Sequence, residues 1–168
     1  MRRSEYVIDQ MNSGDWEQVR SIYLEGISTG NTTFETDAPS WEDWDMGHLQ
    51  IARLVARNGE DILGWAALSP VSKRHAYRGV AEVGISVTER SRGQGIGRTL
   101  LKALIEESER NGLWTLQAVI LPENTASVKL HRRYDFREVG KRERIAKLNG
   151  IWRDTLLFER RSKIVGLL

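Results

Sequence analysis

Cysteine is missing from this chain of 168 residues, and proline occurs only at positions 39, 70 and 122. The lack of cysteine excludes disulfides, thiolate metal sites and a cysteine nucleophile, and it fits a reducing compartment. No apolar run approaches the roughly 20 residues that a membrane-spanning helix needs. The N-terminal sequence MRRSEYVIDQ also has no apolar segment typical of a secretory signal. We therefore expect a cytoplasmic protein with no membrane partner.

The chain also has little net charge. Its 25 Lys and Arg residues nearly balance 23 Asp and Glu residues, which leaves a formal charge of +2. There is no long block of like charge, so we expect no nucleic-acid partner. Hydrophobic residues make up 40% and charged residues 29%, an ordinary globular balance. The length suits one compact domain, which we expect to span residues 1–168.

Hydrophobic periodicity predicts an α/β protein with a mixed central sheet of about seven strands and about four flanking helices. Hairpins come early and late in the chain, and a β-α-β segment lies between them, so the pattern does not favour a doubly wound sheet. The predicted strands cover residues 5–10, 51–57, 62–69, 81–87, 113–121, 136–147 and 151–160, and the predicted helices cover 15–28, a segment capped by Ser40, 97–111 and 124–134.

A glycine-rich segment joins the fourth predicted strand to the third predicted helix. It reads RGQGIGR, from Arg92 to Arg98. Glycine allows main-chain N–H groups to approach a ligand without an intervening Cβ, and a helix N-terminus attracts anions. Two arginines beside such a loop can neutralise phosphate oxygens. The local pattern is therefore typical of a phosphate site.

Several interpretations of this loop compete. A dinucleotide fingerprint needs the spacing G-x-G-x-x-G and an acidic residue about 20 positions later, and neither is present. A Walker loop needs Gly-Lys-Ser/Thr, which is also missing. The pyrophosphate loop of an acyl-coenzyme A enzyme fits better. A glycine-rich turn that binds nothing is the remaining alternative.

Longer segments carry a family resemblance. RGQGIG fits the Q/R-x-x-G-x-G/A signature of the GNAT N-acetyltransferases. The segments EVGISVTERSRGQGIGRTLLKALIEESERNGL, PENTASVKLHRRYDF and NGIWRDTLLFER resemble the phosphinothricin and methionine-sulfone acetyltransferase branch, as do NTTFET and KRHAY upstream. The resemblance covers roughly residues 5–160. It implies an acetyl-coenzyme A (acetyl-CoA)-dependent N-acetyltransferase with no metal.

The resemblance also implies which residues contact acetyl-CoA. In this family the strand before the loop bulges, and its free N–H groups bind the pantetheine arm and polarise the thioester carbonyl. Asn124 would reach the cofactor or act as a helix N-cap, and Arg133 would contact coenzyme A or remain a solvated cation. The residues implied in cofactor binding are Ile85, Ser86, Val87, Arg92, Gly93, Gln94, Gly95, Ile96, Gly97, Arg98, Asn124 and Arg133.

Amine acetylation needs a neutral amine, so a group must remove a proton. Glu82 matches the position of the family's proposed base, although a surface carboxylate in an ion pair is the plainer alternative. Many relatives carry a tyrosine that protonates the leaving thiolate, where this chain has His131. His131 could supply that acid, the thiolate could leave without one, or the histidine could simply be packed; Tyr134 is a weaker candidate.

For the acceptor, the resemblance implies contacts from Phe34, Arg74 and Tyr77. A guanidinium can hold a carboxylate through two hydrogen bonds, which suits an amino acid. We expect direct attack on the thioester in a ternary complex, with phosphinothricin, methionine sulfone and methionine sulfoximine as the leading acceptors. The alternatives are a protein or peptide amine as acceptor, or a coenzyme A-binding module without activity. The family also implies a homodimer and links such enzymes to herbicide resistance.

Overall fold

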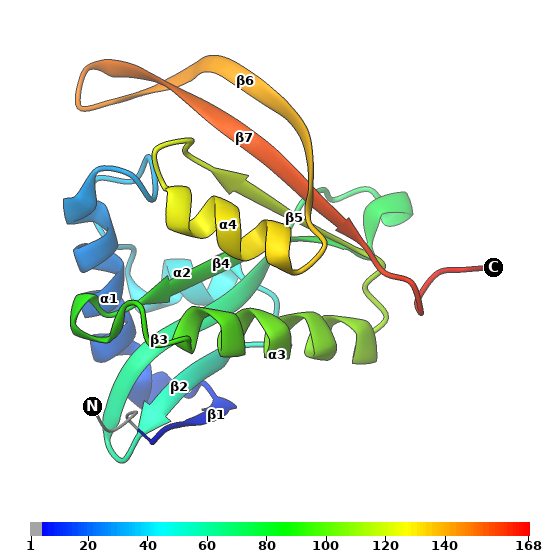
Figure 1. Cartoon of the computed structure of the whole chain (residues 1–168). Coiled ribbons are helices and arrows are strands. Elements are labelled where there is room, and N and C mark those ends of the chain that lie inside the picture. Colours follow the sequence, from blue (N-terminus) through cyan, green and yellow to red (C-terminus); the bar gives the residue numbers. More distant parts are fainter. Residues whose placement is uncertain (1–4) are drawn as a thin grey trace.

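A computed structural model describes residues 5–168; residues 1–4, which include the two N-terminal arginines, lie outside the described part. The seven strands form one sheet in the order β1-β2-β3-β4-β5-β7-β6 (Figure 1). The strands are β1 (Val7–Gln10), β2 (Leu54–Asn58), β3 (Asp61–Pro70), β4 (Val80–Val87), β5 (Thr115–Ile120), β6 (Arg137–Leu148) and β7 (Ile151–Arg161). The α-helices are α1 (Trp16–Thr29), α2 (Trp41–Gly47), α3 (Ile96–Arg110) and α4 (Thr125–Arg133). The predicted mixed sheet and the order of its elements are confirmed.

Helices cover both faces of the sheet, because alternate strand residues point to opposite sides. On one face, Leu100, Leu101 and Leu104 of α3 are fully buried against the sheet, and α4 joins the same core. On the other face, α1 and α2 bury Val19 and Trp44 in a second core. Side chains of a single strand therefore reach two different environments.

The two halves of the sheet separate at its centre. β4 pairs with β3 along its length, from Ala81 to Val87, but its parallel pairing with β5 ends at Glu82 opposite Gln117. Beyond that point β5 stays paired with β7 as far as Ile120. The main chain of residues 83–87 consequently has one edge without a strand partner in the described part of the chain. Such an edge leaves N–H and C=O groups free to bind a ligand.

The early elements are joined by a carboxylate–guanidinium pair. Arg57 donates from Nη1 and Nη2 to the two carboxylate oxygens of Asp15, at 2.8 and 2.9 Å. The N–H of Asn12 donates to Asp15 as well, at 3.0 Å. Asp15 is buried, and the hydrogen bonds from Arg57 lower the pKa of its carboxyl group. The pair therefore stabilises the folded state while Asp15 is charged.

We expect Asp15→Asn to lower the free energy of unfolding by about 2 kcal/mol at pH 7, because the partly buried guanidinium of Arg57 loses its buried carboxylate partner and keeps only the more exposed Asp9. Since the folded protein holds the pKa below the unfolded value, this stabilisation is present above the unfolded pKa and is lost as the pH falls through the folded one. Denaturant unfolding at pH 7 and pH 3 measures the difference in the free energy of unfolding between the wild type and Asp15→Asn, and this difference should be smaller at pH 3. Asp61→Asn, which disturbs an exposed pair with Arg90 at 3.9 Å, serves as the control and should change little. An equal difference at both pH values would contradict the assignment.

Candidate active site

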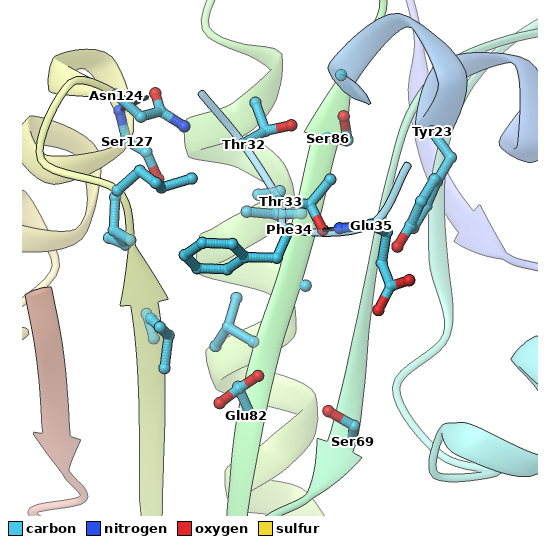
Figure 2. A pocket seen from close by; sticks show the side chains of 18 of the residues that line it. Tyr23, Thr32, Thr33, Phe34, Glu35, Ser69, Glu82, Ser86, Asn124 and Ser127 are labelled. Atoms are coloured by element: carbon cyan, nitrogen blue, oxygen red, sulfur yellow. Dashed lines mark hydrogen bonds between the residues drawn. The ribbon is translucent and has the colours of Figure 1, made fainter. Parts of the chain in front are cut away.

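A pocket of about 420 Å³ occupies the gap between β4 and β5. Residues 82–86 of β4 and residues 118–121 at the end of β5 form its two sides. The loop after α1 covers it with residues 32–35, and Figure 2 shows Phe34 projecting from this loop into the space between the two strands. α4 completes the wall with its N-cap Asn124 and with Ser127 and His131 from one face of the helix.

Glu82 lies where the two strands part. Its Oε1 accepts a hydrogen bond of 2.8 Å from Nε2 of Gln117, the residue opposite on β5. Its side chain shares a face with Gly84 and Ser86, whereas Val83 and Ile85 pack into the core under α3. Glu82 is half-buried and makes no ion pair in the described structure. A carboxylate held by one neutral donor in a pocket can accept a proton, so the geometry is compatible with a base.

His131 lines the same pocket but is almost fully buried. Its Nδ1 lies 2.8 Å from the carbonyl oxygen of Ser127, and a carbonyl only accepts, so Nδ1 carries the proton. Burial lowers the pKa of the imidazole, although the Ser127 carbonyl opposes this effect. Neutral His131 then has a lone pair on Nε2 and no proton to give from it. This arrangement does not favour the expected role as an acid.

The strand expected to bulge does not do so. β4 pairs with β3 without a register shift, and its free edge results from the separation of β4 and β5. Of the three residues expected at the pantetheine, Ile85 and Ser86 line the pocket, while Val87 packs toward the core beside α3. Asn124 both caps α4 and lines the pocket, so its position fits each of the two expected roles. Its Oδ1 caps α4 by accepting from Ser127 N–H at 3.3 Å, and the residue also lines the pocket.

The glycine loop forms a second hollow of about 270 Å³ together with α4. Gly93 and Gly95 have positive φ values of 76° and 84°, which only glycine adopts without strain. Gly95 is the N-cap of α3, so the first N–H groups of that helix have no helical partner. Gly97 lies in the first turn and lines the hollow as well. These donors and the helix N-terminus suit a pyrophosphate.

Cations surround this hollow from two elements. Arg98 of the glycine loop and Arg133, which the resemblance left as a coenzyme A contact or a solvated cation, both line it, and Lys129 lies one turn before Arg133 on α4. Other predicted loop residues do not line it: Ile96 is buried in the core, and Arg92 and Gln94 are exposed. Their assignment to cofactor binding stays a prediction.

The part of the pocket around Glu35 and Glu82, which we call the acceptor end, carries negative charge. Glu35 and Glu82 line it, and no Lys or Arg does so among residues 5–168. Burial raises the pKa of the Tyr23 hydroxyl at this end, and the nearby Glu35 carboxylate adds to the shift while Thr33 opposes it. An ammonium group fits these surroundings better than a carboxylate does.

Two of the three predicted acceptor contacts lie elsewhere. Phe34 lines the pocket, but Arg74 and Tyr77 are exposed in the loop between β3 and β4 and do not line it. This loop follows the pocket's rim, where Ser69 pairs with Glu82 one position before the β3–β4 pairing ends. The structure therefore does not bring Arg74 together with Glu82.

Some residues that line the two hollows were not predicted from the sequence. Lys129 could have been found, because it precedes Arg133 by four residues and thus shares its helix face. Trp44 and Trp65 are buried in the core and also line the larger pocket. Their position depends on how α2 and β3 pack together, and no local signal indicates it.

The family model and the similar proteins all belong to acetyltransferases. The model of the acetyltransferase (GNAT) family matches residues 16–136, more than half of the chain. The phosphinothricin N-acetyltransferase of Alcaligenes faecalis is 31% identical over 155 residues, which cover 87% of this chain and 77% of that protein. The L-methionine sulfoximine/L-methionine sulfone acetyltransferase of Pseudomonas paraeruginosa is 35% identical over 94 residues, 56% of this chain and 55% of that protein.

A solved structure is similar over nearly the whole fold. The phosphinothricin acetyltransferase of Sinorhizobium meliloti, a GNAT superfamily protein crystallised with acetyl-CoA, superposes with a TM-score of 0.86 at 26% identity. The superposition covers 97% of this chain and 91% of that one. In the described residues, no helix is long and apolar enough to cross a membrane, and no cluster of His, Asp and Glu is suited to a metal ion.

Proposed function

This chain belongs to the acetyltransferase (GNAT) family, and we propose that it transfers acetyl from acetyl-CoA to the α-amine of a small amino acid or amino-acid analogue. Phosphinothricin, methionine sulfone and methionine sulfoximine are the acceptors we place first. They are the compounds in the names of the relatives from Alcaligenes and Pseudomonas.

The observation that carries this proposal is that α4 borders both hollows. Asn124, Ser127 and His131 face the pocket at Glu82, whereas Lys129 and Arg133 face the glycine loop. A coenzyme A molecule lying along α4 would place its pyrophosphate at Gly93–Gly97 and its thioester in the gap between β4 and β5. The free edge of residues 83–87 would then supply N–H donors to the pantetheine and to the oxyanion that forms on the carbonyl.

The chemistry that we propose is direct attack. Glu82 takes a proton from the acceptor's ammonium group, either directly or through a water molecule. The amine nitrogen then bonds to the thioester carbon, the carbon–sulfur bond breaks, coenzyme A leaves as a thiolate, and the nitrogen releases its second proton to water to give the neutral amide. We propose no acid for the thiolate, because neutral His131 holds its proton on Nδ1 toward Ser127. Holding both substrates in one pocket accounts for much of the rate.

The test is an acceptor screen that detects the free thiol released from acetyl-CoA. It covers amino acids, sulfones, phosphinates, polyamines and peptides. We expect the highest kcat/KM with a small amino-acid analogue. No thiol release with any amine would reject the enzyme and favour a binding module.

A second candidate rests on the charge of the pocket. Because two carboxylates and, among residues 5–168, no Lys or Arg line the pocket, a peptide's N-terminal amine, which brings no nearby carboxylate, fits as well as a free amino acid. Under this alternative, amidation of the acceptor's carboxylate improves the reaction. Under the proposed function, amidation weakens it.

Arg74→Ala separates the two candidates. If the exposed loop after β3 moves onto a bound amino acid, its guanidinium pairs with the acceptor's carboxylate. We then expect the KM for the amino-acid acceptor to rise about tenfold, with little change in the KM for acetyl-CoA. Steady-state kinetics with an amino acid and its amide measure the effect. The KM for the amide should not change on substitution, because the amide has no carboxylate for Arg74 to bind. An equal rise in the KM values of acceptor and acetyl-CoA would count against the role of Arg74.

We also propose a homodimer, supported by exposed Ile151 and Trp152 on β7 beside the edge strand β6. Light scattering of the purified protein measures its mass. A cytoplasmic location and a part in herbicide resistance stay predictions from the sequence.

A further inference from the structure

The loop between α1 and α2 has few attachments to the rest of the protein. It supplies residues 32–35 to the lining of the larger pocket, and Phe34 enters the space between β4 and β5 (Figure 2). Among residues 5–168, no main-chain hydrogen bond joins residues 31–39 to another segment. The position of the pocket's cover therefore depends on side-chain contacts.

The Thr33 side chain hydrogen-bonds to Tyr23 of α1, and Arg153 of β7 makes a second set of these contacts. Its Nη1 donates to the carbonyl oxygen of Gly30 at 2.8 Å, and its Nη2 donates to Oδ1 of Asn31 at 2.7 Å. Nη2 also lies 3.2 Å from Oε2 of Glu123, the residue before the N-cap of α4. The Arg153 side chain is only 16% exposed, so water competes little for these hydrogen bonds.

One guanidinium thus joins three elements that surround the pocket: the loop after α1, the start of α4, and β7. The planar fork of arginine holds several acceptors at fixed angles, which a lysine ammonium cannot do. Arg153 does not line the pocket itself. Any effect on the reaction must pass through the residues that it holds.

We propose that Arg153 is a positioning residue that fixes the loop carrying Phe34 over the acceptor. This inference rests on the proposed function, because it assigns the role of a residue in the same reaction. The guanidinium anchors the first two residues of the loop, and Phe34 follows three residues after Asn31. Without the anchor, the loop occupies several positions and the acceptor is bound in fewer productive orientations.

The test substitution is Arg153→Met, which keeps the apolar part of the side chain and removes the donors. We expect the KM for the acceptor to rise about tenfold, while the KM for acetyl-CoA changes less than about twofold. Arg153→Lys should give an intermediate value. Arg137→Met, which disrupts an exposed pair with Glu159 on the same hairpin, is the matched control and should match the wild type.

A double-mutant cycle tests whether the effect passes through Asn31. Asn31→Ala removes one acceptor of the Arg153 hydrogen bonds and should raise the acceptor KM by less than Arg153→Met does. Combined with Arg153→Met it should add nothing further, since the contact is already lost. Fully additive effects, or equal rises in both KM values, would overturn the inference.

Hydrogen exchange of the Asn31 and Glu35 amides, which donate to the hydroxyls of Thr29 and Thr33, supplies a readout without any substrate. We expect faster exchange at these two amides for Arg153→Met than for the wild type and for Arg137→Met. Unchanged exchange would reject the anchor even in a fully active enzyme. If the wild type acetylates no acceptor but the exchange rates differ as expected, the proposed function fails and the anchor remains.

Discussion

Glu82→Gln is expected to lower kcat/KM for the acceptor about 10²- to 10³-fold at pH 7, because it removes the group that takes the amine's proton. Glutamine has nearly the same shape, and its amide oxygen can still accept from Nε2 of Gln117, as Glu82 does at 2.8 Å. The end of the pairing between β4 and β5 should therefore be preserved. The loss reports on proton transfer and not on a collapsed pocket.

The pH dependence makes this prediction specific. Without a base, the variant depends on amine that is already neutral in solution, so its rate should rise about tenfold for each pH unit below the amine's own pKa. The difference from the wild type should narrow as the pH rises. Turnover between pH 6 and 10 measures it, and Glu106→Gln, an exposed carboxylate of α3, is the control. Full turnover of Glu82→Gln across this range would show that Glu82 is not the base.

The sequence predicted most of the fold because its local signals agree with the final packing. Leu100, Leu101 and Leu104 repeat at helical spacing and are fully buried in α3. Asp135, just after α4, has a φ of 66°, and aspartate adopts this left-handed region more readily than most residues. Ser40 was expected to cap the second helix, and its Oγ accepts from Asp43 N–H at 3.1 Å.

The site was predicted less completely, for a physical reason. A glycine loop before a helix is a local feature, so the sequence alone could place Gly93, Gly95 and Gly97 at the start of α3, while their contact with a pyrophosphate stays a prediction. Arg153 lies 123 positions from Gly30, and only the pairing of β7 beside β5 brings the two together. The family resemblance assigned Arg74 to the acceptor, but its loop is exposed in the structure. Loop positions depend on packing and on ligands, which local spacing does not describe.

The second prediction with a large effect concerns the other end of acetyl-CoA. Gly97→Val should raise the KM for acetyl-CoA about 10²-fold or more. Gly97 lines the hollow beneath the glycine loop, and a Cβ built there lies 3.6 Å from Leu130 and 3.8 Å from Val87. These are ordinary contacts, so the protein tolerates the first added carbon, while further methyl groups fill the space for the pyrophosphate. Losing two charge-assisted hydrogen bonds costs about 3 kcal/mol or more, which corresponds to about 10²-fold in affinity.

Gly97 is a better test position than its neighbours. Gly93 and Gly95 have positive φ, so a side chain there would strain the loop whether or not a ligand binds. Gly97 is helical, and valine costs no more than glycine in a helix, so the melting temperature should stay close to that of the wild type. Gly47→Val, at an exposed glycine of α2 with nothing within 4 Å of its Cβ position, is the matched control. Calorimetric titration with coenzyme A measures the dissociation constant directly. Wild-type affinity in a folded Gly97→Val protein would mean that the pyrophosphate binds elsewhere, and the proposed path of acetyl-CoA along α4 would then be wrong.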